Sequence, residues 1–173
     1  MSLQGRHAVI TGAGSGIGRA TAERLAEAGC QVTLIGRHLG RLTESADRIG
    51  DAAFVAPADV TDPDALAAAI EVGRDRFGPI DILVNNAGTA SSAPFLKTSA
   101  DDLRAMLALN LEAPAEAARL VLPGMLTRRW GRIVNVASTA GLKGYPYVSA
   151  YVAAKHGLVG LTRAVALEVA SKG

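Results

Sequence analysis

Tyr151 and Lys155 stand four residues apart in a stretch with a helical pattern, and Ser138 lies a short distance upstream at the end of an apolar run. Residues at positions i and i+4 share one face of a helix, so the phenol and the ammonium would point into the same space. A cation beside a phenol favours the ionised form and lowers the tyrosine pKa from about 10 towards a range in which the side chain can exchange protons. A buried Tyr–Lys face could also be plain packing, and the remaining motifs have to decide between the two.

The elements that would position this pair follow an alternating pattern. Short apolar runs rich in β-branched residues alternate with longer helical stretches, which is typical of repeated βαβ units and a parallel sheet. The predicted strands are 7–11, 31–36, 52–58, 79–85 and 131–137. The predicted helices are 16–28, 39–49, 63–77, 100–127 and 149–171. We therefore expect an α/β fold with a doubly wound parallel sheet (Rossmann-like), whose ligands bind outside the carboxyl ends of the strands.

The helix boundaries carry local signals. Asp62 and Ser99 are expected N-caps, and Gly29 and Gly78 are expected C-terminal stops. Pro114 should bend or split the helix predicted over 100–127.

A length of 173 residues without a linker or internal repeat fits one domain over 1–173.

A glycine-rich segment, TGAGSGIG, follows the first strand directly and opens the first helix. Gly12 would permit the tight turn, Gly16 would let a pyrophosphate approach the backbone, and Gly18 would allow close helix packing. A strand-to-helix turn without a ligand would use the same glycines. The position between strand and helix favours dinucleotide binding. The predicted contacts here are Gly12, Ala13, Gly14, Ser15, Gly16, Ile17 and Gly18.

The end of the second strand addresses the choice of cofactor. Dinucleotide folds that bind NAD often carry an acidic residue there, but this chain has Gly36 and Arg37. The glycine leaves room for a 2′-phosphate, and the guanidinium of Arg37 could neutralise it. NADP is therefore the favoured cofactor and NAD stays possible. The alternative is a solvated arginine at the start of a loop.

Two further strand ends carry polar groups. Asp59 and Val60 follow the third strand, where the adenine ring of a dinucleotide should lie, although Asp59 could merely cap a turn. Asn85 and the segment Asn86-Ala87-Gly88 end the fourth strand, where the order of the sheet should reverse. Small residues there would let ribose and nicotinamide lie against the backbone, and the two amides could tie neighbouring strand ends together. Alone, the segment would also fit a simple turn.

Asn110 interrupts an otherwise apolar helix. A buried amide needs hydrogen-bond partners, so Asn110 could hold a water molecule or a backbone group near Lys155. The alternative is a partly exposed helix residue.

Charge and composition exclude other classes of function. The net charge is +2 with both signs interspersed, so neither a basic patch for nucleic acid nor an acidic tail is indicated. The single cysteine, Cys30, and the lack of paired histidine spacing argue against a metal site. No apolar run reaches the ~18 residues that would span a bilayer, and the first residues lack a signal-peptide core. We expect a cytoplasmic protein whose partners are small molecules or copies of itself.

Together these motifs resemble the short-chain dehydrogenase/reductase family, from near residue 5 to the last residue. The pattern is most similar to 3-oxoacyl-[acyl-carrier-protein] reductases and to 3-hydroxyacyl and 3-hydroxybutyrate dehydrogenases. The motifs that carry the resemblance are TGAGSGIG (11–18), Asp59-Val60, Asn85-Asn86-Ala87-Gly88, Asn110, Ser138 and Tyr151 with Lys155. The sequence departs from the family at Ser15, where many NADP-preferring members carry a basic residue.

The resemblance implies an NAD(P)-dependent oxidoreductase that interconverts a ketone, of 3-oxoacyl or similar type, and a secondary alcohol. Tyr151 would be the general acid/base and Lys155 its electrostatic partner and a ribose ligand. Ser138 would donate a hydrogen bond to the substrate oxygen, and Asn110 would belong to a proton relay. Helices such as those over 100–127 and 149–171 commonly pack against another subunit, which implies a homotetramer or homodimer.

Family chains continue beyond the point that matches Gly173, into a further strand and a segment that contacts the nicotinamide and the substrate. We therefore expect residues 1–173 to lack a carboxyl-terminal part of the catalytic domain. This expectation motivates an alternative function, a catalytically silent dinucleotide-binding or subunit-interaction module. Cofactor-dependent turnover of a simple ketone distinguishes the two.

Overall fold

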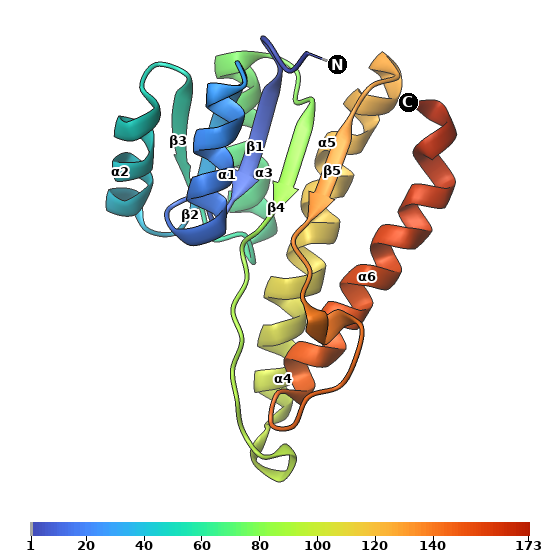
Figure 1. The fold of residues 1–173 in the computed structure, drawn as a ribbon. Coiled ribbons are helices and arrows are strands. Elements are labelled where there is room, and N and C mark those ends of the chain that lie inside the picture. The colour runs from blue at the N-terminus through green and yellow to red at the C-terminus, as the bar shows by residue number, and fades with distance from the viewer. Residues whose placement is uncertain (1) are drawn as a thin grey trace.

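The computed structural model describes residues 2–173 and contains one parallel sheet in the order β3-β2-β1-β4-β5 (Figure 1). The strands are β1 (His7–Thr11), β2 (Gln31–Gly36), β3 (Ala53–Pro57), β4 (Ile82–Asn85) and β5 (Arg132–Asn135). The α-helices are α1 (Gly16–Glu27), α2 (Leu39–Ile49), α3 (Pro63–Phe77), α4 (Ala100–Leu107), α5 (Ala113–Arg128) and α6 (Ser149–Val169). The predicted doubly wound α/β fold is confirmed.

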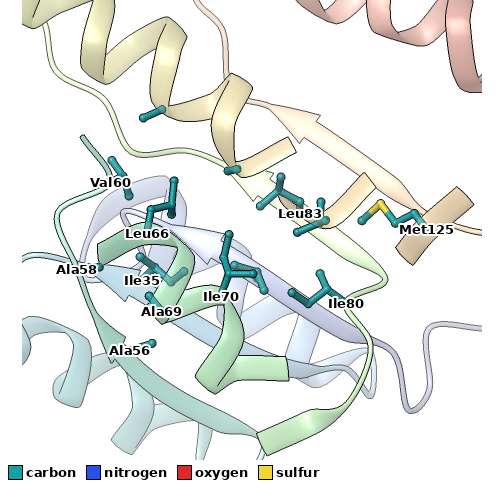
Figure 2. Packing of buried hydrophobic residues seen from close by; sticks show 14 residues of the cluster. Ile35, Ala56, Ala58, Val60, Leu66, Ala69, Ile70, Ile80, Leu83 and Met125 are labelled. Carbon is teal, nitrogen blue, oxygen red and sulfur yellow. The ribbon is translucent and has the colours of Figure 1, made fainter. Parts of the chain in front are cut away.

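The two faces of the sheet bury different residues of the same strand. In β1, Ala8 and Ile10 pack towards α1 and α2, whereas Val9 packs towards α3 and α5. Figure 2 shows Leu66 and Ile70 of α3 gathered over the second face with Leu83 of β4. This alternation follows from the pleat of a strand, whose successive side chains point to opposite faces. Both faces are apolar because helices cover both, as parallel sheets require.

Three strands are shorter than predicted. β3, β4 and β5 were expected over 52–58, 79–85 and 131–137, and the ladder leaves out residues at both ends of β3 and β5 and at the start of β4. Pro79 cannot donate a ladder hydrogen bond, which removes the first residue expected for β4. The Asp81 amide does donate to the His7 carbonyl at 2.9 Å, just before the regular pairing begins.

The helix ends at which the sequence predicted a cap or a stop agree with the structure. Asp62 accepts hydrogen bonds from two backbone amides at the start of α3, and Ser99 forms a reciprocal capping box with Asp102 at the start of α4. Gly78 follows α3 with a φ of +80°, and Gly29, with a φ of +90°, follows the end of α1 after Ala28.

The helix predicted over 100–127 is divided. A π-helical turn, Ala108–Glu112, separates α4 from α5, and Pro114 lies in the first turn of α5. Proline lacks the N–H that would continue regular α-helical bonding, so the predicted effect of Pro114 is confirmed as a split. Pro123 lies inside α5, and its consequence for the helix was not predicted.

Helix α6 lies at the outer edge of the sheet. Figure 1 shows its first turns near α4 and the segment after β5, and its last turns running beside β5. β5 pairs with β4 on one side only within the described sheet. Among residues 2–173, no helix has the length and apolar character to cross a membrane.

Candidate active site

The conformation of the glycine-rich turn between β1 and α1 requires residues without a side chain. Gly12 has a φ of +66°, and a Cβ there would lie 2.8 Å from the Asn86 amide nitrogen. A Cβ at Gly18 would overlap the Gly12 carbonyl oxygen. The tight turn predicted at Gly12 and the close helix packing predicted at Gly18 are therefore confirmed.

The N-terminus of α1 is free to meet an anion. Ser15 has an extended backbone and its side chain caps no amide, and the first turn of α1 carries no acidic residue. Gly16 has a φ of +54°, and a Cβ there would meet no atom within 4 Å. A helix N-terminus with unpaired amides and open space before it attracts phosphate oxygens.

Asn85, the last residue of β4, and Asn86, which follows it, connect neighbouring strands, as predicted. The Asn86 side-chain amide donates to the carbonyl oxygens of Thr11 at 3.0 Å and Gly12 at 3.2 Å. The Asn85 side-chain amide donates to Asn135 Oδ1 at 2.9 Å. These bonds fix the ends of β1, β4 and β5 relative to one another, at the point where the strand order reverses.

A cavity of about 160 Å³ lies outside the carboxyl ends of β1, β2, β3 and β4. It brings together most residues that the sequence predicted for cofactor binding. Of that set, the cavity is lined by Gly12, Gly14, Ser15, Arg37, Asp59, Val60, Ala87 and Gly88. Ala13 is buried behind the turn and Ile17 is exposed on α1.

Asp59 performs the turn-capping role that was its alternative reading. Its Oδ1 accepts from the Thr61 amide at 3.0 Å and from the Thr61 hydroxyl at 2.7 Å. The backbone hydrogen bond from Thr61 is the main reason why the pKa of the Asp59 carboxyl lies below its usual value. Its Oδ2 lies 3.8 Å from the Arg37 guanidinium, so Arg37 has an ionic partner at the rim of the cavity.

Tyr151 and Lys155 share one face of α6, as the spacing predicted. The Lys155 ammonium nitrogen lies 5.7 Å from the centre of the Tyr151 ring. Lys155 is 5% exposed and donates a hydrogen bond to the Val136 carbonyl oxygen at 2.9 Å. Burial lowers the pKa of this ammonium.

Ser138 follows β5 and caps the short turn Thr139–Gly141, because its Oγ accepts from the Ala140 amide at 3.1 Å. This leaves the hydroxyl proton of Ser138 for another acceptor.

Asn110 is completely buried in the π-helical turn, which excludes the exposed-residue alternative. Its amide nitrogen donates to the Thr89 carbonyl at 3.1 Å and the Met106 carbonyl at 3.2 Å. Its Oδ1 has no hydrogen-bond partner within residues 2–173. A Cβ at Gly88 would lie 2.8 Å from this oxygen and 3.7 Å from the Lys155 nitrogen, so the unpaired oxygen faces the space beside Lys155.

A sequence profile described as short chain dehydrogenase matches residues 6–173. The chain belongs to this family. A crystal structure of a short-chain dehydrogenase from Streptomyces avermitilis has a similar fold, with a TM-score of 0.93 and 35% sequence identity over 97% of this chain and 63% of that one.

Two relatives among the short-chain dehydrogenases carry more specific names. A D-beta-hydroxybutyrate dehydrogenase of Rhizobium meliloti is 42% identical over 96% of this chain. A 3-oxoacyl-[acyl-carrier-protein] reductase FabG of Vibrio cholerae is 37% identical over 100% of this chain. The chain spans 66% of the length of the first and 71% of the length of the second.

One basic residue of the cavity, Arg41, was not predicted from the sequence of this short-chain dehydrogenase. Arg41 of α2 lines the same cavity as Arg37, and a Cβ at Gly14 would lie 3.0 Å from the Arg41 Cβ. Arg41 therefore lies directly over the glycine-rich turn. Its position four residues after Arg37, in the first turn of a helix that begins beside the cavity, is the signal that could have identified it.

The residues present fit a dinucleotide. The open amides at the start of α1 suit a pyrophosphate, and the basic side chains at the cavity mouth suit further phosphate oxygens. No three His, Cys, Asp or Glu side chains gather at a point where they could hold a metal ion, in the part of the chain that the structure describes.

Proposed function

We propose that this protein is an NAD(P)-dependent oxidoreductase that interconverts a ketone and a secondary alcohol, with Tyr151 as general acid/base. One observation carries the proposal. Gly88 lines the cavity beside the glycine-rich turn and also lies against Asn110 and Lys155. The candidate cofactor site therefore meets Lys155, the partner of Tyr151 on α6, at one residue, and hydride and proton transfer to the same carbonyl group require such proximity.

The cofactor would be held along the carboxyl ends of the strands. The amides of residues 14–18 would bind the pyrophosphate, and Asp59-Val60 would border the adenine. Asn86, Ala87 and Gly88 would lie against the ribose and nicotinamide, with Lys155 and Tyr151 as ribose ligands. NADP is favoured because two guanidinium groups, those of Arg37 and Arg41, border the cavity.

When bound, the nicotinamide supplies the hydride to the carbonyl carbon, or accepts it from the alcohol carbon. The chain's own residues handle the proton. The Ser138 hydroxyl donates a hydrogen bond to the substrate oxygen, and Tyr151 gives its phenolic proton to that oxygen in reduction or takes it in oxidation. Lys155 stabilises the phenolate of Tyr151 by its positive charge. Asn110 Oδ1 accepts a hydrogen bond from a group that returns the proton to Tyr151.

The substrate class and assembly are further parts of the proposal. The similarity to a hydroxybutyrate dehydrogenase and a 3-oxoacyl reductase supports a substrate of 3-oxoacyl or 3-hydroxyacyl type. Residues 1–173 would form one catalytic domain that belongs to a homodimer or homotetramer.

The test is the oxidation of NADPH in the presence of an acetoacetyl thioester, measured as the loss of reduced-nicotinamide absorbance. Tyr151→Phe should lower turnover by ~10²-fold or more while cofactor binding survives, because the ring stays and the transferable proton is lost. Lys155→Met should impair both turnover and binding. Tyr147→Phe, which removes a hydroxyl from an exposed tyrosine nearby, is the matched control.

Binding of NADPH without turnover of any simple ketone would instead support the silent module. Near-native turnover in Tyr151→Phe would show that the tyrosine is structural.

A further inference from the structure

The end of β5 is attached to α6 at two points. The Lys155 ammonium donates to the Val136 carbonyl oxygen at 2.9 Å, and the Asn135 side-chain amide donates to Thr162 Oγ1 at 2.8 Å. Lys155 and Thr162 are seven residues apart, which is about two turns of an α-helix, so they lie on the same face. The last residue of β5 and the residue after it thus hold the helix that carries Tyr151 at two points about two turns apart.

The second attachment belongs to a chain of polar groups. Asn85 of β4 donates to Asn135 Oδ1 at 2.9 Å and to the Pro114 carbonyl oxygen of α5 at 3.1 Å. The Thr162 hydroxyl donates in turn to the Leu158 carbonyl oxygen at 2.7 Å. We name the side chains of Asn85, Asn135 and Thr162 the amide latch. The latch joins β4, β5, α5 and α6 through side-chain hydrogen bonds.

The surroundings of the latch are apolar. Pro114, Asn135 and Thr162 line a groove of about 590 Å³ between α5, β5 and α6, whose other walls include Ile133, Leu161 and Val165. Apolar contacts are non-directional and allow a helix to slide, whereas a hydrogen bond fixes two atoms. Several residues of α6 after Leu161 are exposed. Packing therefore constrains the position of this part of α6 weakly. The hydrogen bonds of the amide latch fix the position of α6 along β5.

We propose that Asn135 and Thr162 are positioning residues, which set the register of α6 on β5 and so hold Tyr151 and Lys155 opposite Ser138. Ser138 follows Asn135 by three residues at the end of the same strand. A shift of α6 along β5 therefore moves Tyr151 relative to Ser138. This inference rests on the proposed function for its catalytic consequence, and on the hydrogen bonds alone for its structural one.

Helix α5 offers a matched control for Thr162. Thr127 of α5 donates its hydroxyl to the Pro123 carbonyl oxygen at 3.0 Å, the same bond to the preceding turn that Thr162 makes. Thr162 differs because its oxygen also accepts from another element. Thr162→Val and Thr127→Val each remove one hydroxyl with little change in shape, and only the first removes a bond between α6 and the sheet.

The first experiment measures the chemical reactivity of the Lys155 amine and does not depend on turnover. Labelling of its amine by an amine-reactive reagent over a range of pH, quantified by mass spectrometry, gives the pH of half-labelling. Thr162→Val should raise this pH, because a loosened α6 admits water and favours the charged ammonium. It should also increase severalfold the labelling rate measured well above this pH, because the neutral amine is then more accessible to the reagent. Thr162→Ser, which restores the acceptor, and Thr127→Val should match the native protein. Asn135→Ala removes the same bond from the strand side and should reproduce the effect of the valine.

The second experiment uses turnover. Thr162→Val and Asn135→Ala should each lower kcat by ~10-fold or more, the scale expected when reacting groups are misplaced by a fraction of an ångström to an ångström. The cofactor Kd should rise by less than kcat falls, because most of the proposed cofactor contacts lie outside α6. The double variant should be no slower than Asn135→Ala, since the bond that Thr162→Val removes is already lost in that variant. Identical labelling of Lys155 in Thr162→Val and Thr127→Val would overturn the proposal. A native protein without turnover would refute the proposed function, while the labelling would still decide whether the latch holds Lys155.

Discussion

Charge at the cavity mouth is a property of single residues. Arg37 has Asp59 as an ionic partner at 3.8 Å, which reduces the positive charge that it offers to a phosphate. Arg41 lies over the glycine-rich turn and lines the same cavity. Preference for NADP should therefore depend on both guanidinium groups.

Arg37→Ala and Arg41→Ala should each weaken NADPH binding by about 1–3 kcal/mol, the scale of a lost charge-assisted hydrogen bond, and leave NADH binding nearly unchanged. Titrations that follow nicotinamide fluorescence give both dissociation constants. Arg48→Ala, at the far end of α2, is the control and should leave both constants as they are. An unchanged ratio in both test variants would remove the basis for NADP.

His7 connects stability to pH at the opposite end of the sheet. Its Nδ1 lies 2.9 Å from the Gly78 carbonyl oxygen and its Nε2 lies 2.9 Å from Thr33 Oγ1, and the side chain is buried. Burial is the main reason why the pKa of this imidazole lies below its usual value. The unfolded chain therefore binds a proton more readily than the folded one. The stabilising contribution is present above the unfolded pKa of about 6.5 and is lost as the pH falls below it.

Chemical denaturation between about pH 7.5 and pH 5.5 should show a falling free energy of unfolding, with a slope of up to about 1.4 kcal/mol per pH unit from this one proton. His7→Gln should flatten the slope. His156→Gln, which alters an exposed histidine of α6, should retain it. Equal slopes in all three proteins would show that His7 does not control this transition.

At the scale of elements, the order and type of the helices and strands were predictable because each carries its own period, and α3 and α4 also carry N-caps. The π-helical turn was not, since its residues keep a helical pattern and only Pro114 hinted at a break. The glycine turn could be predicted because its geometry is local. The Asn135–Thr162 bond could not, because it joins residues whose proximity exists only after α6 packs beside β5. The same holds for Arg41, which approaches Gly14 only when α2 has folded against α1.

The contact between α1 and the glycine turn provides a test of an element's position. Gly18→Ala should destabilise the protein by about 1–3 kcal/mol, because the added Cβ overlaps the Gly12 carbonyl oxygen and the helix has to move. Cofactor binding should weaken with it, since the amides of α1 move as well. Thermal unfolding with and without NADPH measures both effects.

Gly160→Ala is the control for this substitution. Gly160 lies inside α6 with no atom near the position of an added Cβ, so alanine should stabilise the protein by about 0.5–1 kcal/mol. A Gly18→Ala protein as stable as the native one would show that α1 does not need its observed distance from the turn.

At the scale of the whole molecule, the outer edge of β5 and the apolar groove beside it lie on one side. β5 pairs only with β4 in the described sheet, and Val134 is 49% exposed on it. Unpaired strand edges with apolar side chains promote association between chains.

We expect a polypeptide of residues 1–173 to associate with its own copies and to bind a dye that reports exposed apolar surface. Val134→Lys should reduce association in size-exclusion chromatography, because a charge on an edge strand opposes pairing. Val72→Lys, at a similarly exposed valine of α3, should have little effect. A single monomeric peak for the native polypeptide would contradict the expectation.

The central place of β1 also determines how long one of its edges stays open during synthesis. One edge of β1 pairs with β2, where Ala8 lies opposite Val32, and that edge is covered early. The other edge pairs with β4, where Ala8 lies opposite Ile82, so it stays open until the ribosome has released the middle of the chain. Pairing between distant segments is slow, and an open apolar edge attracts wrong partners while it waits. During the interval between the emergence of β3 and that of β4, a nascent chain therefore presents an unpaired apolar edge of its central strand.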